Sequence, residues 1–307
     1  MKRIFLFFIF WQGISYACLG ARPLSMGGAF VAVSSDVHST YWNPAGLADV
    51  KKPQVTGMRT LNNRDIINYQ EWFAGAFRVG EETGMGACYV HAINRTGFKN
   101  LFTDDEWAVL SFGGYGQGML SKTAFGFNIR RYSSSLQKGT LYIGGATWVN
   151  MGKKDTAIGI DIGILHKLNK DLTLGLLIQD VNEPSIKFER VVIDNYEYDL
   201  KFTHPLNIRP GIAWKPDDKS IISMDIYNLD FNDVYDEEDW DQTSIRIGFE
   251  RWIRPYLAIR GGLYGRSFHT LGIGFKSKYK GSNIEIDYGL METGGCSFHL
   301  LSATIKY

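Results

Sequence analysis

The chain has no long hydrophobic run, little proline and almost no net charge, and each shortage excludes a class of protein. No stretch reaches the roughly 18 apolar residues that a membrane-spanning helix needs. The 33 lysines and arginines nearly balance the 32 aspartates and glutamates, which argues against a nucleic-acid partner. Only 8 prolines interrupt 307 residues, whereas 34 glycines, 16 tyrosines and 19 phenylalanines are present. This composition suits one large all-β domain.

Cysteine and catalytic motifs are scarce as well. Cys18, Cys88 and Cys296 are an odd number without metal-ligand spacing, so no metal site and no cofactor are predicted. We interpret them as incidental thiols, and a disulfide between Cys88 and Cys296 stays open. Six histidines are present, but no spacing among them and the serines indicates a catalytic triad. The sequence therefore predicts no catalytic residues and no enzyme.

What the chain has in abundance is a period of two. Ile286, for example, lies between Glu285 and Asp287, and the alternation continues to the last residue, Tyr307. Because a strand sends alternate side chains to opposite faces, each such segment has one apolar face and one charged or glycine-rich face. That pattern favours a β-barrel with lipid outside and polar contents inside. The clearest segments are 158–164, 245–250 and 284–290.

The spacing of the strand-like segments indicates a topology. From Pro53 onward we count about fourteen segments, an even number within the range of transmembrane barrels. Short turns such as 168–171 alternate with long connections. If the N-terminus lies in the periplasm, every long connection falls outside the cell, as in outer-membrane barrels. The predicted long connections are 94–105, 133–155, 182–205 and 230–242.

The N-terminal 52 residues have a different texture. Residues 1–17 combine Lys2 and Arg3 with an apolar stretch and small residues before Cys18, which predicts a cleaved secretory signal peptide. Cleavage there leaves Cys18 first, so lipidation of Cys18 is the alternative to ordinary cleavage. Residues 18–52 are rich in small residues and turn formers without a sustained period. We expect them to fold as a plug inside a barrel formed by residues 53–307.

The segment 20–48, GARPLSMGGAFVAVSSDVHSTYWNPAGLA, closely resembles the N-terminal signature of the FadL/PorV-type outer-membrane barrels. The segments GIDIGILHKLNKDLTLGLLIQDVNEP and SFHLLSATIKY look like the same superfamily, in its PorV/PorQ and uncharacterised spirochaete-type branch. The resemblance implies a fourteen-stranded barrel in the outer membrane of a Gram-negative-type bacterium, with an N-terminal plug, or hatch. It also implies that Asn43, Pro44 and Ala45, followed by Gly46, match the plug's Asn-Pro-Ala motif.

Alternation also assigns charged side chains to the inside of the barrel. Their signs alternate between neighbouring strands, so they can pair across the wall and against the plug. One interpretation is a selective polar pathway, and the other is a neutralised lumen that holds the plug. The predicted lumen charge network consists of Arg130, Arg209, Asp225, Arg246, Glu250, Arg260, Lys276, Glu285 and Asp287.

Two functions follow from the resemblance and remain open. In the first, the barrel passes small hydrophobic molecules, long-chain fatty-acid-like, past the plug. In the second, it is a PorV-like component of a type IX-type secretion and surface-attachment system. The expected partners are outer-membrane lipid together with a hydrophobic ligand or secretion-system proteins.

Overall fold

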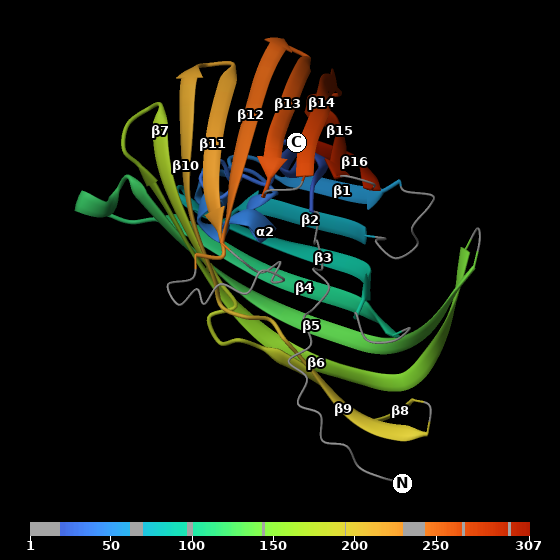
Figure 1. Ribbon diagram of the computed structural model, residues 1–307. Coiled ribbons are helices and arrows are strands. Elements are labelled where there is room, and N and C mark those ends of the chain that lie inside the picture. The colour runs from blue at the N-terminus through green and yellow to red at the C-terminus, as the bar shows by residue number, and fades with distance from the viewer. Residues whose placement is uncertain are drawn as a thin grey trace.

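The computed structural model describes residues 19–61, 70–96, 101–142, 145–193, 195–229, 243–265, 268–293 and 296–307. Fourteen strands close into one antiparallel barrel in which β1 pairs with β16, as predicted from the sequence (Figure 1). The barrel strands are β1 (Gln54–Thr60), β2 (Gln70–Arg78), β3 (Thr83–Arg95), β4 (Leu101–Tyr115), β5 (Thr123–Tyr142), β6 (Gly145–Lys167), β7 (Leu172–Gln179), β10 (Asn207–Asp217), β11 (Ser220–Tyr227), β12 (Ser244–Arg254), β13 (Leu257–Tyr264), β14 (Phe268–Tyr279), β15 (Ser282–Thr293) and β16 (Cys296–Lys306).

A short, mostly helical segment fills the lumen. It contains α1 (Ala21–Ser25), α2 (Ser39–Trp42) and the 3-10 helix η1 (Pro44–Asp49), and nearly all of its side chains are buried. Apart from it, the helical structure includes only η3 (Gly118–Leu120) among the described residues. None of the helices described is long and apolar enough to cross a bilayer. Residues 19–50 therefore form the plug, and residues 1–18 lie outside the described residues.

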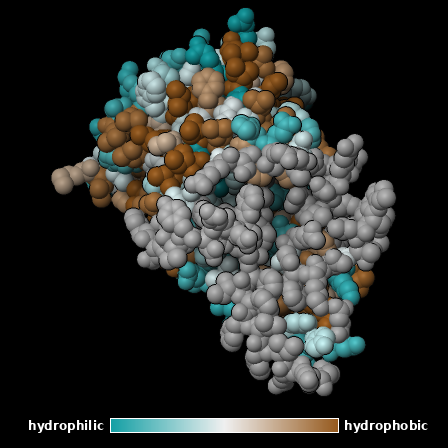
Figure 2. All heavy atoms as spheres, viewed as in Figure 1, coloured by the Kyte–Doolittle hydropathy of each residue, from teal (hydrophilic) through white to brown (hydrophobic). Residues whose placement is uncertain are grey.

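The period of two places apolar side chains on the outer surface. Ile245, Ile247 and Phe249 point outward from β12, while Arg246 and Glu250 between them are buried. On β15, Ile286 and Tyr288 are likewise exposed, and Ile284 is half-buried. Figure 2 shows hydrophobic residues gathered on the upper left of the molecule, where Figure 1 places β7, β10, β11 and β12. The outer surface is that of a transmembrane barrel.

Polar pairs lie near both ends of this outer surface. At the end with the long connections, Arg59 on β1 faces Glu71 on β2 at 3.7 Å. At the end with the short turns, Arg251 on β12 reaches Asp217 on β10 at 3.2 Å. We call these the long-loop end and the short-turn end of the barrel. Both pairs are largely exposed, so they mark where the apolar surface stops rather than stabilising the fold strongly.

Two of the predicted long connections are not loops. Residues 133–155 continue β5 and β6 as a hairpin that extends past the end of β7, because residues in this stretch pair from Ser133↔Thr156 to Tyr142↔Gly145. This stretch is polar and lacks the alternation of apolar residues that marks a lipid-facing strand. A hairpin that extends beyond the bilayer does not require that alternation. Residues 182–205 contain a separate hairpin, β8 (Ser185–Ile193) and β9 (Tyr196–Thr203), which buries Phe188 and Phe202. The predicted connection 230–242 lies outside the described residues, and the described part of 94–105 is mostly strand.

We expect depth in the bilayer to decide the cost of charge on the outer surface. Ile286→Arg places a cation at the middle of the apolar surface and should destabilise the barrel by about 2–4 kcal/mol. Ser277→Arg makes the outward side chain near the short-turn end of β14 a cation and should cost at most about 1 kcal/mol. Urea unfolding in lipid vesicles measures both. Equal losses would contradict the assignment of Ile286 to the lipid-facing surface.

Candidate functional site

The plug rests against a ring of glycines on the inside of the wall. A methyl group added at Gly126 would collide with the backbone of Ala45, and one added at Gly113 would collide with the Pro44 carbonyl. Around most of the barrel the plug packs directly on wall backbone, mainly through its own backbone, and at Gly86, Gly163 and Gly272 through the side chains of Thr40, Asn43 and Ser25. We call this ring the glycine collar: Gly84, Gly86, Gly113, Gly126, Gly163, Gly175, Gly248, Gly262 and Gly272.

The Asn-Pro-Ala motif lies in this contact. The side chain of Asn43 is fully buried, and its Nδ2 donates to the carbonyls of Val31 at 3.0 Å and of Ile164 on β6 at 3.2 Å. Its Oδ1 accepts from the amide of Ala45 at 3.2 Å and so caps η1. A methyl group at Gly46 would collide with the carbonyl of Ser34. The motif thus joins two parts of the plug to each other and to the wall.

A carboxylate of the wall holds a second part of the plug. Asp225 on β11 accepts hydrogen bonds from the amides of Phe30 and Val31, at 2.7 and 2.9 Å. Just before these residues, Gly27 and Gly28 have φ angles of 63° and 67°, a conformation that glycine adopts without strain. The turn therefore presents two backbone donors to one buried carboxyl group.

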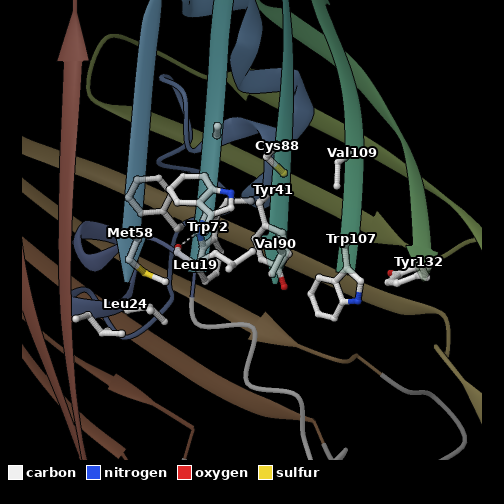
Figure 3. Close-up of a cluster of buried hydrophobic side chains, with 14 of the residues drawn as sticks. Leu19, Leu24, Tyr41, Met58, Trp72, Cys88, Val90, Trp107, Val109 and Tyr132 are labelled. Carbon is white, nitrogen blue, oxygen red and sulfur yellow. Dashed lines mark hydrogen bonds between the residues drawn. The ribbon is translucent and has the colours of Figure 1, made fainter. Parts of the chain in front are cut away.

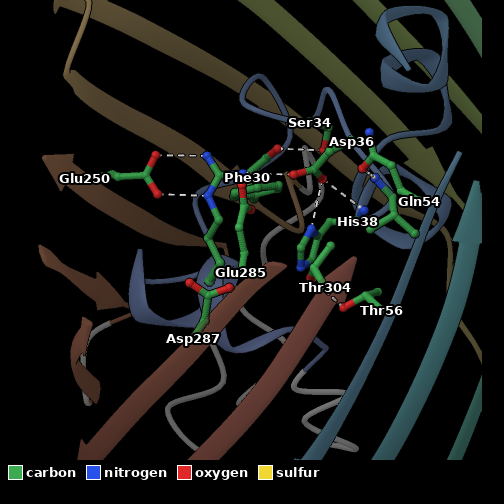
Figure 4. A network of polar contacts seen from close by, with 12 residues as sticks. Phe30, Ser34, Asp36, His38, Gln54, Thr56, Glu250, Glu285, Asp287 and Thr304 are labelled. Carbon is green, nitrogen blue, oxygen red and sulfur yellow. Dashed lines mark hydrogen bonds and ion pairs between the residues drawn. The ribbon is translucent and has the colours of Figure 1, made fainter. Parts of the chain in front are cut away.

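A chain of ion pairs connects the plug to β12, β13 and β15, and Figure 4 shows the part of it around Glu250 and Asp36. Arg22 of α1 binds Glu250 through two hydrogen bonds of 2.8 and 2.9 Å, and it also reaches Asp36 at 3.0 Å. Glu250 also accepts from Arg260 at 2.6 Å, and Arg260 donates to Asp287 at 2.8 Å. Glu250, Arg260 and Asp287 are buried, so loss of one partner would leave an uncompensated charge.

The network continues toward the short-turn end. Lys306 lies 2.9 Å from Glu285 and 3.8 Å from Asp36, and Lys276 lies 3.3 Å from Glu285. Burial by itself raises the pKa of Asp36, but His38, Lys306 and Arg22 outweigh it, so the pKa of this carboxyl is well below its ordinary value. The plug therefore keeps a charged carboxylate against the wall.

Arg130 belongs to a separate cluster on β5 and β6. It is fully buried and donates to Asp161 at 2.6 Å, while Asn128 donates to the same carboxylate at 2.8 Å. Further toward the long-loop end, Tyr132 stacks on His204 with ring centres 3.9 Å apart. Burial and the Arg130 charge lower the pKa of His204 to about 3, so this ring is neutral at physiological pH.

Arg209 and Arg246 are held by aromatic rings rather than by carboxylates. Arg209 lies 4.2 Å from the ring centre of Tyr227, and Arg246 lies 3.8 Å from Tyr227 and 3.9 Å from Tyr264. Within the described part of the chain, neither arginine forms an ion pair, and the buried Nε of Arg246 has no hydrogen-bond partner. We call these four side chains, from β10 to β13, the arginine–tyrosine ladder. Cation–π contact of this kind stabilises a desolvated cation.

The wall on the other side is apolar. Met58, Trp72, Val90 and Trp107 point inward from β1 to β4 and are buried together with Leu19 of the plug (Figure 3). We call the part of the lumen between the plug and the long-loop end the upper lumen. Met58 and Trp72 contact the plug itself, through Gly20 and His38. The apolar wall of the upper lumen is therefore that of Val90 and Trp107 on β3 and β4, and the arginine–tyrosine ladder lies on β10–β13.

The structure places the residues of the predicted lumen network in five groups. Glu250, Arg260 and Asp287 share one ion-pair chain, whereas Lys276 pairs with Glu285 and is itself partly exposed. Arg130 stands apart with Asp161; Arg209 and Arg246 share Tyr227, and Asp225 binds the plug backbone. The sequence reasoning missed Arg22, Asp36, Asp161, Tyr227, Tyr264 and Lys306. Asp161 could have been found from its place in the ladder 158–164, but Arg22 and Asp36 lie in a segment without a period.

The cysteines and acidic side chains form no metal site in the described part of the chain. Cys88 is a free, buried thiol. Cys18 lies outside the described residues, and the side chain of Cys296 is not described.

Comparison with known proteins places the fold among outer-membrane channels. The Pseudomonas putida toluene transporter TodX superposes with a TM-score of 0.63 at 15% identity, covering 99% of this chain and 98% of that chain. The CymD monoaromatic hydrocarbon channel superposes with a TM-score of 0.63 at 14% identity, covering 93% of this chain and 96% of that chain. A Pseudomonas aeruginosa FadL homologue superposes with a TM-score of 0.60 at 9% identity, covering 92% of this chain and 96% of that chain. The chain therefore has the fold of the FadL-type outer-membrane barrels.

Sequence comparison alone finds less. Residues 147–226 match the family model described as "F plasmid transfer operon, TraF, protein". No curated protein matches the sequence.

The glycine collar predicts that one added methyl group dislodges the plug. Gly126→Ala forces a Cβ into the backbone of Ala45, so we expect faster proteolysis of residues 19–50 and a lower melting temperature. Gly75→Ala on the outer face of β2 is the matched control, because its Cβ meets only atoms at 3.8 and 3.9 Å. Limited proteolysis in detergent checks both. A Gly126→Ala plug as protected as the parent's would show that the wall can yield.

Proposed function

We propose that the protein passes small hydrophobic molecules with an acidic head group, long-chain fatty-acid-like, across the outer membrane and past its plug. The observation that carries this proposal is the two-sided upper lumen. Its apolar wall is suited to a hydrocarbon body, and its arginine–tyrosine ladder offers guanidinium donors to an anionic group. The likeness to a toluene transporter and a hydrocarbon channel supports passage of hydrophobic solutes in general.

The ladder supports an acidic head group rather than a plain hydrocarbon. Buried arginines are usually paired with carboxylates, as Arg130 and Arg260 are here. Arg246 instead presents positive charge close to the plug turn at Gly28, where a methyl group would come within 3.3 Å of Arg246 Nη1, and Arg209 shares the Tyr227 ring with it. A carboxylate entering from the long-loop end would meet these donors before it reached the plug.

The plug gives the barrel a closed resting state. Because the plug backbone packs on the glycine collar, the plug leaves little space along most of the wall. A seal of this kind keeps ions out while hydrophobic solutes are bound. The plug motif Asn43, Pro44, Ala45 and Gly46 positions this seal in the proposal.

The secretion-partner alternative makes a different demand on the protein. It needs an external docking surface, for which the extended β5–β6 hairpin and the β8–β9 hairpin are the candidates. In a deletion strain, accumulation of labelled fatty acid and surface display of a secreted protein separate the two functions. Unchanged uptake with lost display would favour the secretion partner over the transporter.

Removal of a ladder charge should weaken binding of the acid selectively. Arg246→Met removes the guanidinium but keeps the length of the side chain. A charge-assisted hydrogen bond contributes about 1.5–3 kcal/mol, so we expect fatty-acid affinity to fall roughly 10- to 100-fold. Affinity for the methyl ester of the same acid should change little. Titration of purified barrel with each ligand measures the difference.

Arg251→Met is the matched control, because Arg251 lies on the same strand but is half-exposed near the short-turn end. Its affinity for the acid should equal that of the parent. The head-group proposal is wrong if Arg246→Met weakens the acid and the ester equally, or weakens neither.

A further inference from the structure

The boundary between plug and wall is not the same all the way round. The glycine collar covers β3 to β7 and β12 to β14, and Asp225 of β11 binds the plug backbone directly. The strands β16, β1 and β2 contribute no glycine to the collar. The glycines of β1 and β2, Gly57 and Gly75, face outward, and β16 has none.

In this sector the plug meets side-chain ends instead of backbone. The amide of Val37 donates to Gln54 Oε1 at 3.1 Å, and the amide of Gly20 contacts Met58 Sδ at 3.0 Å. The ring of His38 lies 5.3 Å from that of Trp72. Such contacts change by rotation of single bonds, whereas most contacts on the collar are with plug backbone and change only if that backbone moves.

Unpartnered polar atoms gather at the same place. His38 Nε2 and Ser302 Oγ are buried and have no hydrogen-bond partner, and the buried indole N–H of Trp72 meets only the weakly accepting sulfur of Cys88. Ser302 on β16 is opposite Met58 on β1, and Met58 is opposite Trp72 on β2. The wall atoms therefore lie in one row across three strands, spanning roughly 10 Å, with His38 of the plug facing them. Buried donors without partners are rare in folded proteins.

We call the interface formed by His38, Met58, Trp72 and Ser302 the plug seam. On one side it continues into the apolar upper lumen, because Leu300 precedes Ser302 on the inner face of β16. On the other side it continues past Thr56 and Thr304, whose hydroxyls are 2.8 Å apart, to the Lys306–Glu285 ion pair. Side chains thus border it from the upper lumen to the short-turn end.

We propose that solutes pass the plug along the plug seam, and that Trp72 Nε1–H, Ser302 Oγ–H and His38 bind the head group on the way. This rests on the proposed function and adds the route. Two of these groups donate hydrogen bonds, so the seam suits a solute whose head group accepts them, such as a carboxylate. The plug need not leave the collar for passage, since only side chains of the seam rotate.

Thiol labelling tests the route. Ser302→Cys lies in the seam, and Ser223→Cys on β11 is the matched control, because Ser223 is equally buried and faces Gly248 of the collar. Both are made with Cys88→Ala, which offers Trp72 no new acceptor, and the adduct is counted by mass spectrometry as an increase over that parent. With a small methanethiosulfonate reagent, Ser302→Cys should react at least tenfold faster than Ser223→Cys.

A bulky maleimide provides the functional readout. After its reaction, fatty-acid uptake should fall at least tenfold for Ser302→Cys and stay unchanged for Ser223→Cys. If Ser302→Cys folds poorly, Thr56→Cys is the second variant. Thr56 is the next inward residue after Met58 on β1, toward the short-turn end. Equal labelling of seam and control, or normal uptake through a modified seam, would overturn the route. Labelling does not depend on transport. Failure of the transport proposal would therefore be seen separately from failure of the route, because the unmodified parent barrel would neither bind nor take up the acid.

Discussion

The structure depends on one steric constraint: the plug packs against wall backbone at glycines, where the wall itself has no side chain. Each glycine of the collar removes a Cβ that would collide with the plug, as at Gly126 and Ala45. Given that contact, Asn43 can reach a carbonyl of β6, and Asp225 can accept from two plug amides. The ion pairs of Arg22 are possible for the same reason, because they need the plug at a fixed height in the lumen.

Polar groups in the lumen are satisfied in two different ways. Around Glu250 and Arg260, opposite charges pair at hydrogen-bond distance, which neutralises the plug interface. In the upper lumen, Arg209 and Arg246 rest on tyrosine rings; Arg209 also donates to Asn207, and the Nε of Arg246 has no hydrogen-bond partner. The first arrangement fixes a structure, and the second leaves an unmet demand for an anion. The neutralised lumen corresponds to the first part, and the selective polar pathway remains our proposal for the second.

Much of the fold could be read from the sequence, because strands in a lipid bilayer must alternate. Ile245, Ile247 and Phe249 identify their segment as a strand, because they alternate with Arg246, which cannot share the lipid-facing side. Strands outside the bilayer need not alternate in this way. The sequence therefore predicts loops where the structure has the polar extension of β5 and β6 and the hairpin β8–β9. The plug is harder still. Arg22 and Asp36 sit in a segment without a period, and only three-dimensional contact shows that one side chain meets Glu250 and the other Lys306.

The collar also has a consequence for assembly. A wall that fits the plug backbone this closely cannot be threaded by the plug after closure, so the plug must be in place while the sheet is still open. The last junction to form is that between β1 and β16, which joins the two ends of the sheet. This junction lies where glycine is absent and side chains alone meet the plug. The barrel can therefore close there by rotating side chains, without dragging one backbone across another.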